Sequence, residues 1–150
     1  MTIQNAAPPA ELPLSRDMQM RSVLYVEDNP ANRRLIERIF VRRPELHLLT
    51  AVNGNHGVEI ALASRPAVIL MDINLPDISG FKALSLLRAN PATARIPVIA
   101  LSANAMAMNI TSGLEAGFFR YITKPIAIKD FLESLDLALA LARQQSAKGN

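Results

Sequence analysis

The segment AVILMD at residues 67–72 decides the fold of this chain, because it is a continuous apolar run that stops at an acid. A short strand that is apolar on both faces is typical of a parallel sheet covered by helices on each side. Four more short apolar runs lie near residues 22–26, 46–52, 97–101 and 119–123. Helical patterns separate these runs, so the sequence predicts an α/β fold with five strand–helix units.

Capping signals and apolar stripes place the helices between these strands. Asn29 can cap a helix, and Pro30 suits its first turn. Gly117 closes the fourth helix of the series. We predict the other helices at about residues 58–63, from 81 onward, at about 106–116 and from 127 to about 144.

Polar side chains follow four of the five predicted strands. Glu27 and Asp28 follow the first strand, Asp72 the third, Ser102 the fourth and Lys124 the fifth. The carboxyl ends of parallel strands meet at one edge of the sheet, which is where ligands bind in such folds. We therefore expect three acids, a hydroxyl and an ammonium to lie together.

This set of groups suits a divalent cation and a phosphoryl group. Two carboxylates about 4 Å apart repel by roughly 4 kcal/mol at an effective dielectric constant near 20, so the cluster favours a bound proton or cation. Mg²⁺ prefers oxygen ligands and also accepts phosphate oxygens. The Asp72 carboxylate can attack a phosphoryl group, and the Lys124 ammonium and Ser102 hydroxyl can interact with its oxygens.

The composition excludes several other classes of protein. The chain has no cysteine, which excludes disulfides and thiol catalysis, and His47 and His56 cannot form a zinc site alone. No apolar run reaches the roughly 18 residues of a membrane span, and the N-terminus does not resemble a signal peptide. We expect a cytoplasmic protein of one domain.

We predict three regions along the chain. Residues 1–20 are rich in Ala and Pro and are expected to form a flexible leader or linker. Residues 21–143 form the domain, and residues 144–150 form a polar tail.

Much of the net charge of +3 lies in one predicted helix. Its arginines are either a solvated helix face or a docking surface for an acidic partner. Nucleic acid is not expected as a partner, because no DNA-reading motif accompanies them. The arginines are Arg33, Arg34, Arg38, Arg42 and Arg43.

The chain resembles the receiver domain of two-component response regulators over about residues 21–143. Four segments carry the resemblance: VLYVEDN at 23–29, LMDINLP at 70–76 followed by Gly80, IALSA at 99–103 and YITKP at 121–125. The resemblance implies a doubly wound five-stranded parallel sheet of flavodoxin-like order 2-1-3-4-5. Glu27 stands where most receiver domains have Asp. Glu at this position is common in the receivers attached to hybrid histidine kinases.

The resemblance also implies roles for the residues of the cluster. Asp72 looks like the phosphoacceptor, and Glu27 and Asp28 look like the acidic pair that holds Mg²⁺ together with Asp72. Asn74 matches the position whose backbone carbonyl completes the metal site.

Four further residues match the family in the last two motifs. Ser102 resembles the switch hydroxyl, Tyr121 the switch aromatic and Lys124 the lysine that pairs with the phosphoryl group. The bond between Lys124 and Pro125 resembles one that is cis in this family.

The implied function is that of a phosphorylation-controlled signalling module and not of a turnover enzyme. The phosphoryl donor would be a histidine kinase or a histidine phosphotransfer protein. The output would be a protein that binds the face formed by the fourth helix, fifth strand and fifth helix of the domain. A homodimer is left open.

Two adjacent aromatic residues depart from the family pattern just before Tyr121. Side chains alternate along a strand, so Phe118 and Phe119 cannot both point inward. We expect that one of them, Phe119, is exposed and used for binding; the alternative is that it packs under a helix end.

Two other functions remain open at this point. A Mg²⁺-dependent phosphatase with an aspartyl nucleophile would resemble this chain, but such enzymes carry a second acid where Asn74 stands. A flavodoxin-like cofactor binder would need a phosphate loop rich in Ser, Thr and Gly after the first strand. The acidic residues Glu27 and Asp28 occupy that place and would repel phosphate.

Overall fold

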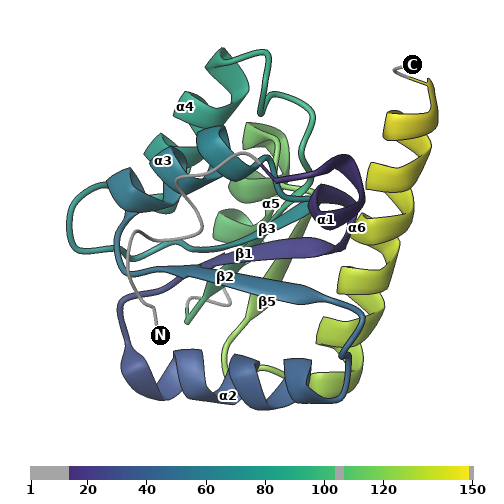
Figure 1. Cartoon of the computed structure of the whole chain (residues 1–150). Helices are drawn as coiled ribbons and strands as arrows, with labels where there is room; N and C mark the ends of the chain where they lie inside the picture. Colours follow the sequence, from purple (N-terminus) through teal and green to yellow (C-terminus); the bar gives the residue numbers. More distant parts are fainter. Residues whose placement is uncertain (1–13, 104–106, 149–150) are drawn as a thin grey trace.

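The chain folds around a single five-stranded sheet. The structure is a computed structural model that describes residues 14–103 and 107–148. The strands lie in the order β2-β1-β3-β4-β5, and each neighbouring pair is parallel, which confirms the predicted sheet (Figure 1). The strands are β1 (Ser22–Val26), β2 (His47–Ala51), β3 (Val68–Asp72), β4 (Val98–Ser102) and β5 (Arg120–Thr123).

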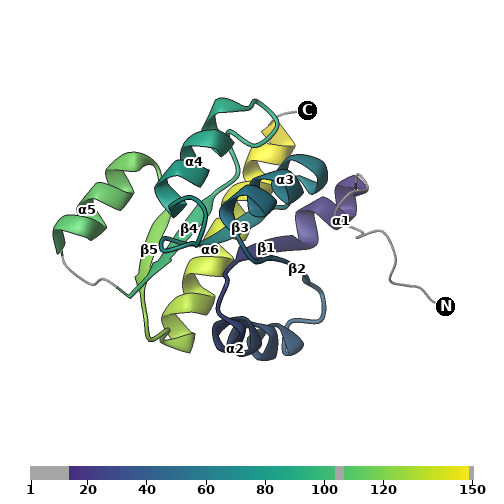
Figure 2. The ribbon, with the colours of Figure 1, turned by 90° about the vertical axis from the view of Figure 1, so that its left-hand side faces the viewer.

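Helices cover both faces of this sheet. Helices α3, α4 and α5 lie on one face and α2 and α6 on the other (Figures 1 and 2), while α1 precedes β1 and lies next to the end of α6. The helices are α1 (Arg16–Arg21), α2 (Pro30–Val41), α3 (Gly54–Ser64), α4 (Gly80–Ala89), α5 (Ala107–Ala116) and α6 (Ile128–Lys148).

The two faces of the sheet support two separate hydrophobic cores. Leu24 and Val26 of β1 join the core under α3 and α4, whereas Val23 and Tyr25 join the core under α2 and α6. This division follows from the alternation of side chains along a strand. Full burial of one large apolar side chain stabilises the fold by about 1.5–3 kcal/mol, so continuous apolar strands favour this two-sided arrangement.

The helix boundaries follow local capping. The Asn29 side chain accepts hydrogen bonds from the amides of Ala31 and Asn32, as predicted for a cap before Pro30. Helix α3 begins four residues before the predicted start, because the Asn53 side chain caps it. Helix α6 continues to residue 148, so the described part of the predicted polar tail is helical.

The described part of the predicted leader is helical from Arg16 onward, which differs from the sequence-based expectation. Ser15 caps α1 by accepting a hydrogen bond from the Met18 amide. The Arg16 guanidinium donates to the carbonyl and hydroxyl of Ser146 on α6. The partner on α6 is 130 residues away in the chain, so no local periodicity revealed this helix. The rest of the predicted leader lies outside the described residues.

Both adjacent phenylalanines are packed, which corrects the expectation that Phe119 is exposed for binding. Phe118 is buried and its ring meets that of Phe81 edge-on, with centroids 5.5 Å apart. Phe119 is partly buried against the core under α2 and α6. Helices cover both faces of the sheet, so alternation directs one ring into each core.

Candidate functional site

The three predicted acids meet at the carboxyl edge of the sheet. β1 and β3 are neighbours, with Val26 paired to Met71, so the residues that follow these two are adjacent. One carboxylate oxygen from each of Glu27, Asp28 and Asp72 lies within 4.8 Å of the others. Glu27 and Asp72 are buried, with 1% and 4% of their surfaces exposed, whereas Asp28 is exposed. The geometry confirms that these acids form one cluster.

Donors from three elements hold the Glu27 carboxylate in place. The Tyr25 hydroxyl donates to Oε1 at 3.0 Å, and the Asn29 amide donates to Oε2 at 3.3 Å. The Asn32 side chain and the Lys124 ammonium donate to Oε1 at 3.4 and 2.9 Å. Burial alone would raise the pKa of Glu27, but hydrogen bonding with Asp72 and Lys124 outweighs burial and lowers the pKa. Glu27 is therefore an ionised carboxylate with a fixed orientation.

Lys124 places a positive charge between two buried acids. Its ammonium lies 2.9 Å from Glu27 Oε1 and 3.6 Å from Asp72 Oδ1. Its backbone amide donates to the Ser102 carbonyl at 2.7 Å, which fixes the end of β5 against β4. The bond between Lys124 and Pro125 is cis, as the resemblance implied.

Asp72 is the acid of the cluster whose ionisation is disfavoured. Burial raises its pKa to about 7, helped by the hydrogen bond and the charge of Glu27 and opposed by Lys124. The Asn74 backbone amide donates to Asp72 Oδ1 at 3.2 Å. A nearby cation favours the ionised form of such a carboxyl group. The three acids together offer the oxygen ligands that Mg²⁺ prefers.

A close approach of backbone to backbone fixes the chain just after Asp72. The Gly80 amide donates to the Ile73 carbonyl at 2.9 Å. A Cβ atom on Gly80 would lie 2.7 Å from the Asp72 carbonyl oxygen, closer than real Cβ contacts allow. Glycine is therefore required at position 80, where the receiver resemblance has one.

The two predicted switch residues lie on β4 and β5, the two strands beyond β3 in the sheet. Ser102 is buried at the end of β4, one position beyond Leu101, which pairs with Asp72. Tyr121 is partly buried on the face under α5. A Cβ atom on Gly113 would lie 2.5 Å from Tyr121 Cδ2, so the ring rests directly on the α5 backbone.

Sequence reasoning identified Lys124 but not the other side chains that support Glu27, which are Tyr25, Asn32 and Arg33. Tyr25 resembles an ordinary core residue of a strand, yet its hydroxyl bonds to Glu27, and burial followed by the charge of Glu27 raises its pKa. Arg33 Nη1 donates to the Glu27 carbonyl at 2.8 Å. The sequence signal available for Tyr25 was a polar side-chain group on a buried strand close to an acid. No sequence feature marked Asn32 or Arg33 as a partner of Glu27.

The comparisons with known proteins assign the chain to a family. The family model of the response regulator receiver domain matches residues 23–136. The polar-differentiation response regulator DivK of Brucella anthropi is 35% identical over 115 residues, which are 77% of this chain and 93% of DivK. DivK of Brucella ovis is 33% identical over the same shares. This chain belongs to the response regulator receiver domains of two-component signalling.

Solved structures agree with this assignment. The receiver domain of the sensor histidine kinase PA1611 from Pseudomonas aeruginosa PAO1 is 32% identical, with a TM-score of 0.73 over 80% of this chain and 98% of that domain. That structure has a magnesium ion coordinated in the active site cleft. A signal receiver domain from Vibrio parahaemolyticus shares the fold, with a TM-score of 0.80 at 23% identity over 87% of this chain and 98% of that chain.

The family assignment favours the receiver function over the phosphatase and flavodoxin-like alternatives. In the part of the chain that the structure describes, no helix is both long enough and apolar enough to cross a membrane.

Proposed function

We propose that this receiver domain takes a phosphoryl group onto Asp72 from a phosphohistidine of a histidine kinase or a histidine phosphotransfer protein. In this step an oxygen–phosphorus bond to Asp72 forms while the nitrogen–phosphorus bond of the donor imidazole breaks. One observation carries the proposal: buried Asp72 lies in a cluster with Glu27 and Asp28 and 3.6 Å from the Lys124 ammonium. Such a transfer depends on positioning and charge neutralisation.

The acids of the cluster would also hold the cofactor. Glu27, Asp28 and Asp72 supply carboxylate oxygens, and the Asn74 backbone carbonyl completes the proposed Mg²⁺ site. Bound Mg²⁺ would neutralise the cluster and one phosphoryl oxygen. The magnesium ion in the PA1611 receiver supports this part of the proposal.

Lys124 and Ser102 would stabilise the transferred group. The Lys124 ammonium already lies beside Asp72 and would pair with a second phosphoryl oxygen as a compact charge. The Ser102 hydroxyl would donate to a third oxygen. Its burial at the end of β4, next to the β3 strand that carries Asp72, supports this role.

Phosphorylation would then favour one of two conformations of the output face. This face consists of α5, β5 and α6, which are the fourth helix, fifth strand and fifth helix of the domain. Tyr121 links the site to it, because its ring rests on α5 at Gly113. A groove of about 330 Å³ runs along the same face between β5 and α6, past Thr123, Asp130 and Glu133, and offers a surface for an output protein.

The proposed module acts on itself and on protein partners, without turnover of a small substrate. We place it in the cytoplasm, with residues 21–143 as the working domain, and nothing in the proposal requires contact with nucleic acid or membrane.

The test is intact-mass analysis after incubation with Mg²⁺ and a small phosphodonor such as acetyl phosphate. We expect one added phosphoryl group on the native chain and none on the Asp72→Ala variant. Asp17→Asn, which changes an exposed acid on α1, is the matched control and should still gain one group. A phosphoryl group on Asp72→Ala would contradict the assignment of Asp72.

A further inference from the structure

A second cavity lies at the edge of the sheet opposite the acidic cluster. It has a volume of about 390 Å³, within the roughly 300–1,000 Å³ of small-molecule sites. Ala67 and Pro97, which line it, precede β3 and β4, so the cavity is at the amino ends of the strands. Asp72 is at the carboxyl end of β3. The cavity is therefore separate from the proposed phosphorylation site.

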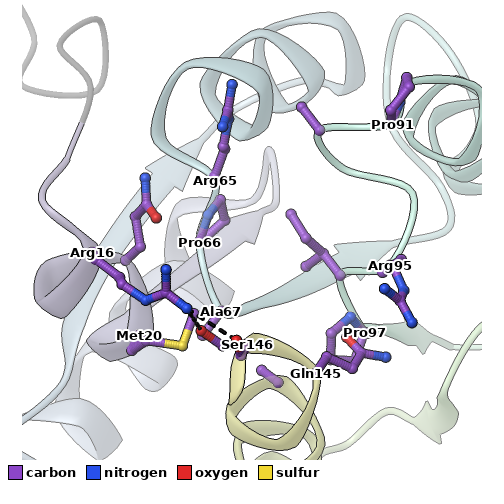
Figure 3. Close-up of a pocket in the computed structure, with 14 residues that line it drawn as sticks. Arg16, Met20, Arg65, Pro66, Ala67, Pro91, Arg95, Pro97, Gln145 and Ser146 are labelled. Atoms are coloured by element: carbon purple, nitrogen blue, oxygen red, sulfur yellow. Dashed lines mark hydrogen bonds between the residues drawn. The ribbon is translucent and has the colours of Figure 1, made fainter. Parts of the chain in front are cut away.

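The lining of this cavity is strongly cationic. Among the described residues it includes Arg16, Arg65 and Arg95 and contains no acidic residue. Within the described residues none of the three forms an ion pair, in contrast to Arg43, which lies 2.8 Å from Asp136. Figure 3 shows the three guanidinium groups at three places around the cavity: Arg16 reaches Ser146, Arg65 extends from the end of α3, and Arg95 precedes β4.

Arg65 stands at a backbone position that favours glycine. It caps the C-terminal end of α3 with φ 47° and ψ 62°, in the left-handed region. An L-residue in this conformation costs roughly 1–2 kcal/mol, which glycine avoids. A ligand-binding role for Arg65 would explain why a long cationic side chain occupies this position on the wall of the cavity.

The remaining walls suit the organic part of a small ligand. Met20, Ile96 and Ala142 give the cavity an apolar side. Arg16 Nη2 donates to the Ser146 carbonyl at 3.0 Å and to its hydroxyl at 2.7 Å, which holds α1 and α6 together at the rim. Arginine side chains therefore line one part of the cavity, and apolar side chains line another part.

Parts of the chain outside the receiver match close this cavity. Arg16 and Met20 belong to α1, and Ala142 and Ser146 belong to the end of α6, whereas the family match covers residues 23–136. The site is therefore a property of this chain and is not implied by the receiver family.

We propose that this cavity binds a small ligand that carries a phosphate or pyrophosphate group. The planar guanidinium forks of Arg65 and Arg95 match phosphate oxygens in bidentate geometry. The absence of acids among the described residues of the lining favours a ligand with more than one negative charge.

Titration of the full chain with inorganic pyrophosphate, followed by calorimetry in the absence of Mg²⁺, tests the proposal. We expect saturable binding of one pyrophosphate per chain. Arg65→Gln and Arg95→Gln should each weaken binding at least about tenfold, the loss expected for one charged hydrogen bond. Both side chains are exposed, so circular dichroism should show that the variants fold.

Arg34→Gln is the matched control, since it removes the same charge from an exposed arginine of α2 away from the cavity. The Arg34→Gln variant should change the affinity for pyrophosphate less than about twofold. An equal loss of affinity in all three variants would show only a general attraction of the anion to a cationic protein and would overturn the proposal. Amide chemical shifts supply a second measurement. Pyrophosphate should move the signals of Ala67 and Gln145, and changes confined to Asp72 and Lys124, or no saturable binding, would also overturn it.

Discussion

The Lys124 ammonium lies 0.7 Å closer to Glu27 than to Asp72, at 2.9 Å from Oε1 of the first and 3.6 Å from Oδ1 of the second. The ionised Glu27 thus takes the stronger ion pair, and Asp72 keeps a raised pKa of about 7. The proposed phosphoacceptor Asp72 therefore has a neighbouring cation, Lys124, whose shortest contact is with Glu27. It also makes the stability of the protein depend on Lys124.

Replacement of Lys124 by Met should lower the free energy of unfolding at pH 7.5 by about 1–3 kcal/mol, because buried Glu27 loses its charged donor and buried Asp72 loses a neighbouring cation. The loss should be smaller at pH 5, where Asp72 carries a proton and only Glu27 needs the cation. Urea unfolding at the two pH values measures both effects. Lys129→Met, at an exposed position of α6, is the control and should change stability little. A loss that is equal at both pH values would contradict the proposed charge balance.

The metal-free protein should become less stable as the pH rises from about 4 to about 7. The folded pKa of Asp72, about 7, is above its ordinary value of 3.8, so the folded state binds more protons than the unfolded state within this window, and stability falls with pH. The full loss is up to about 4 kcal/mol. Thermal unfolding in a chelator should show this slope for the native chain and a flatter profile for Asp72→Asn. An unchanged slope in the variant would assign the effect to another group.

Local signals explain why much of the site was predictable from the sequence. Asp72 follows a strand that is apolar on both faces, and Asn29 with Pro30 marks the start of α2 without reference to the rest of the chain. These features fix the edge at which Glu27 and Lys124 meet Asp72. The position of each acid therefore followed from local pattern and one rule about parallel sheets.

Features that depend on distant partners were not predictable in the same way. Helix α1 is held by Arg16 against Ser146, 130 residues away in the chain. The contact of Asn32 with Glu27 spans only five residues, but no sequence motif marks it. The expectation for Phe119 failed for another reason. It treated the sheet as having one buried face, although the apolar strands already indicated two.

Substitution of Asp28, the exposed acid, should weaken Mg²⁺ binding and leave the stability of the metal-free fold nearly unchanged. Asp28 is the exposed member of the cluster, so Asp28→Asn should unfold at nearly the same temperature as the native chain in a chelator. Mg²⁺ at 100 times its dissociation constant should stabilise the native chain by about 2.7 kcal/mol and stabilise the variant much less. Thermal unfolding across a Mg²⁺ series measures this difference. Equal stabilisation of Asp28→Asn would remove Asp28 from the metal site, and Asp17→Asn should respond as the native chain does.

The contact between Tyr121 and Gly113 should connect the site to the output face. A methyl group at position 113 would collide with the Tyr121 ring, which lies 2.5 Å from the added Cβ atom. Gly113→Ala should therefore displace the ring and cost about 1–3 kcal/mol, reduced by the better helix propensity of Ala. Phosphorylation of Asp72 should persist, while the change in α5 amide signals on phosphorylation should be smaller.

A second substitution on the same contact distinguishes this collision from a general effect on α5. Tyr121→Ala removes the ring, so Gly113→Ala in that background should cost no stability and should gain up to about 1 kcal/mol from helix propensity. Urea unfolding of the two single variants and the double variant completes the cycle. If Gly113→Ala destabilises the protein equally with and without the Tyr121 ring, the two residues do not interact. The proposed connection between Asp72 and the output face then does not pass through the contact of Tyr121 with Gly113.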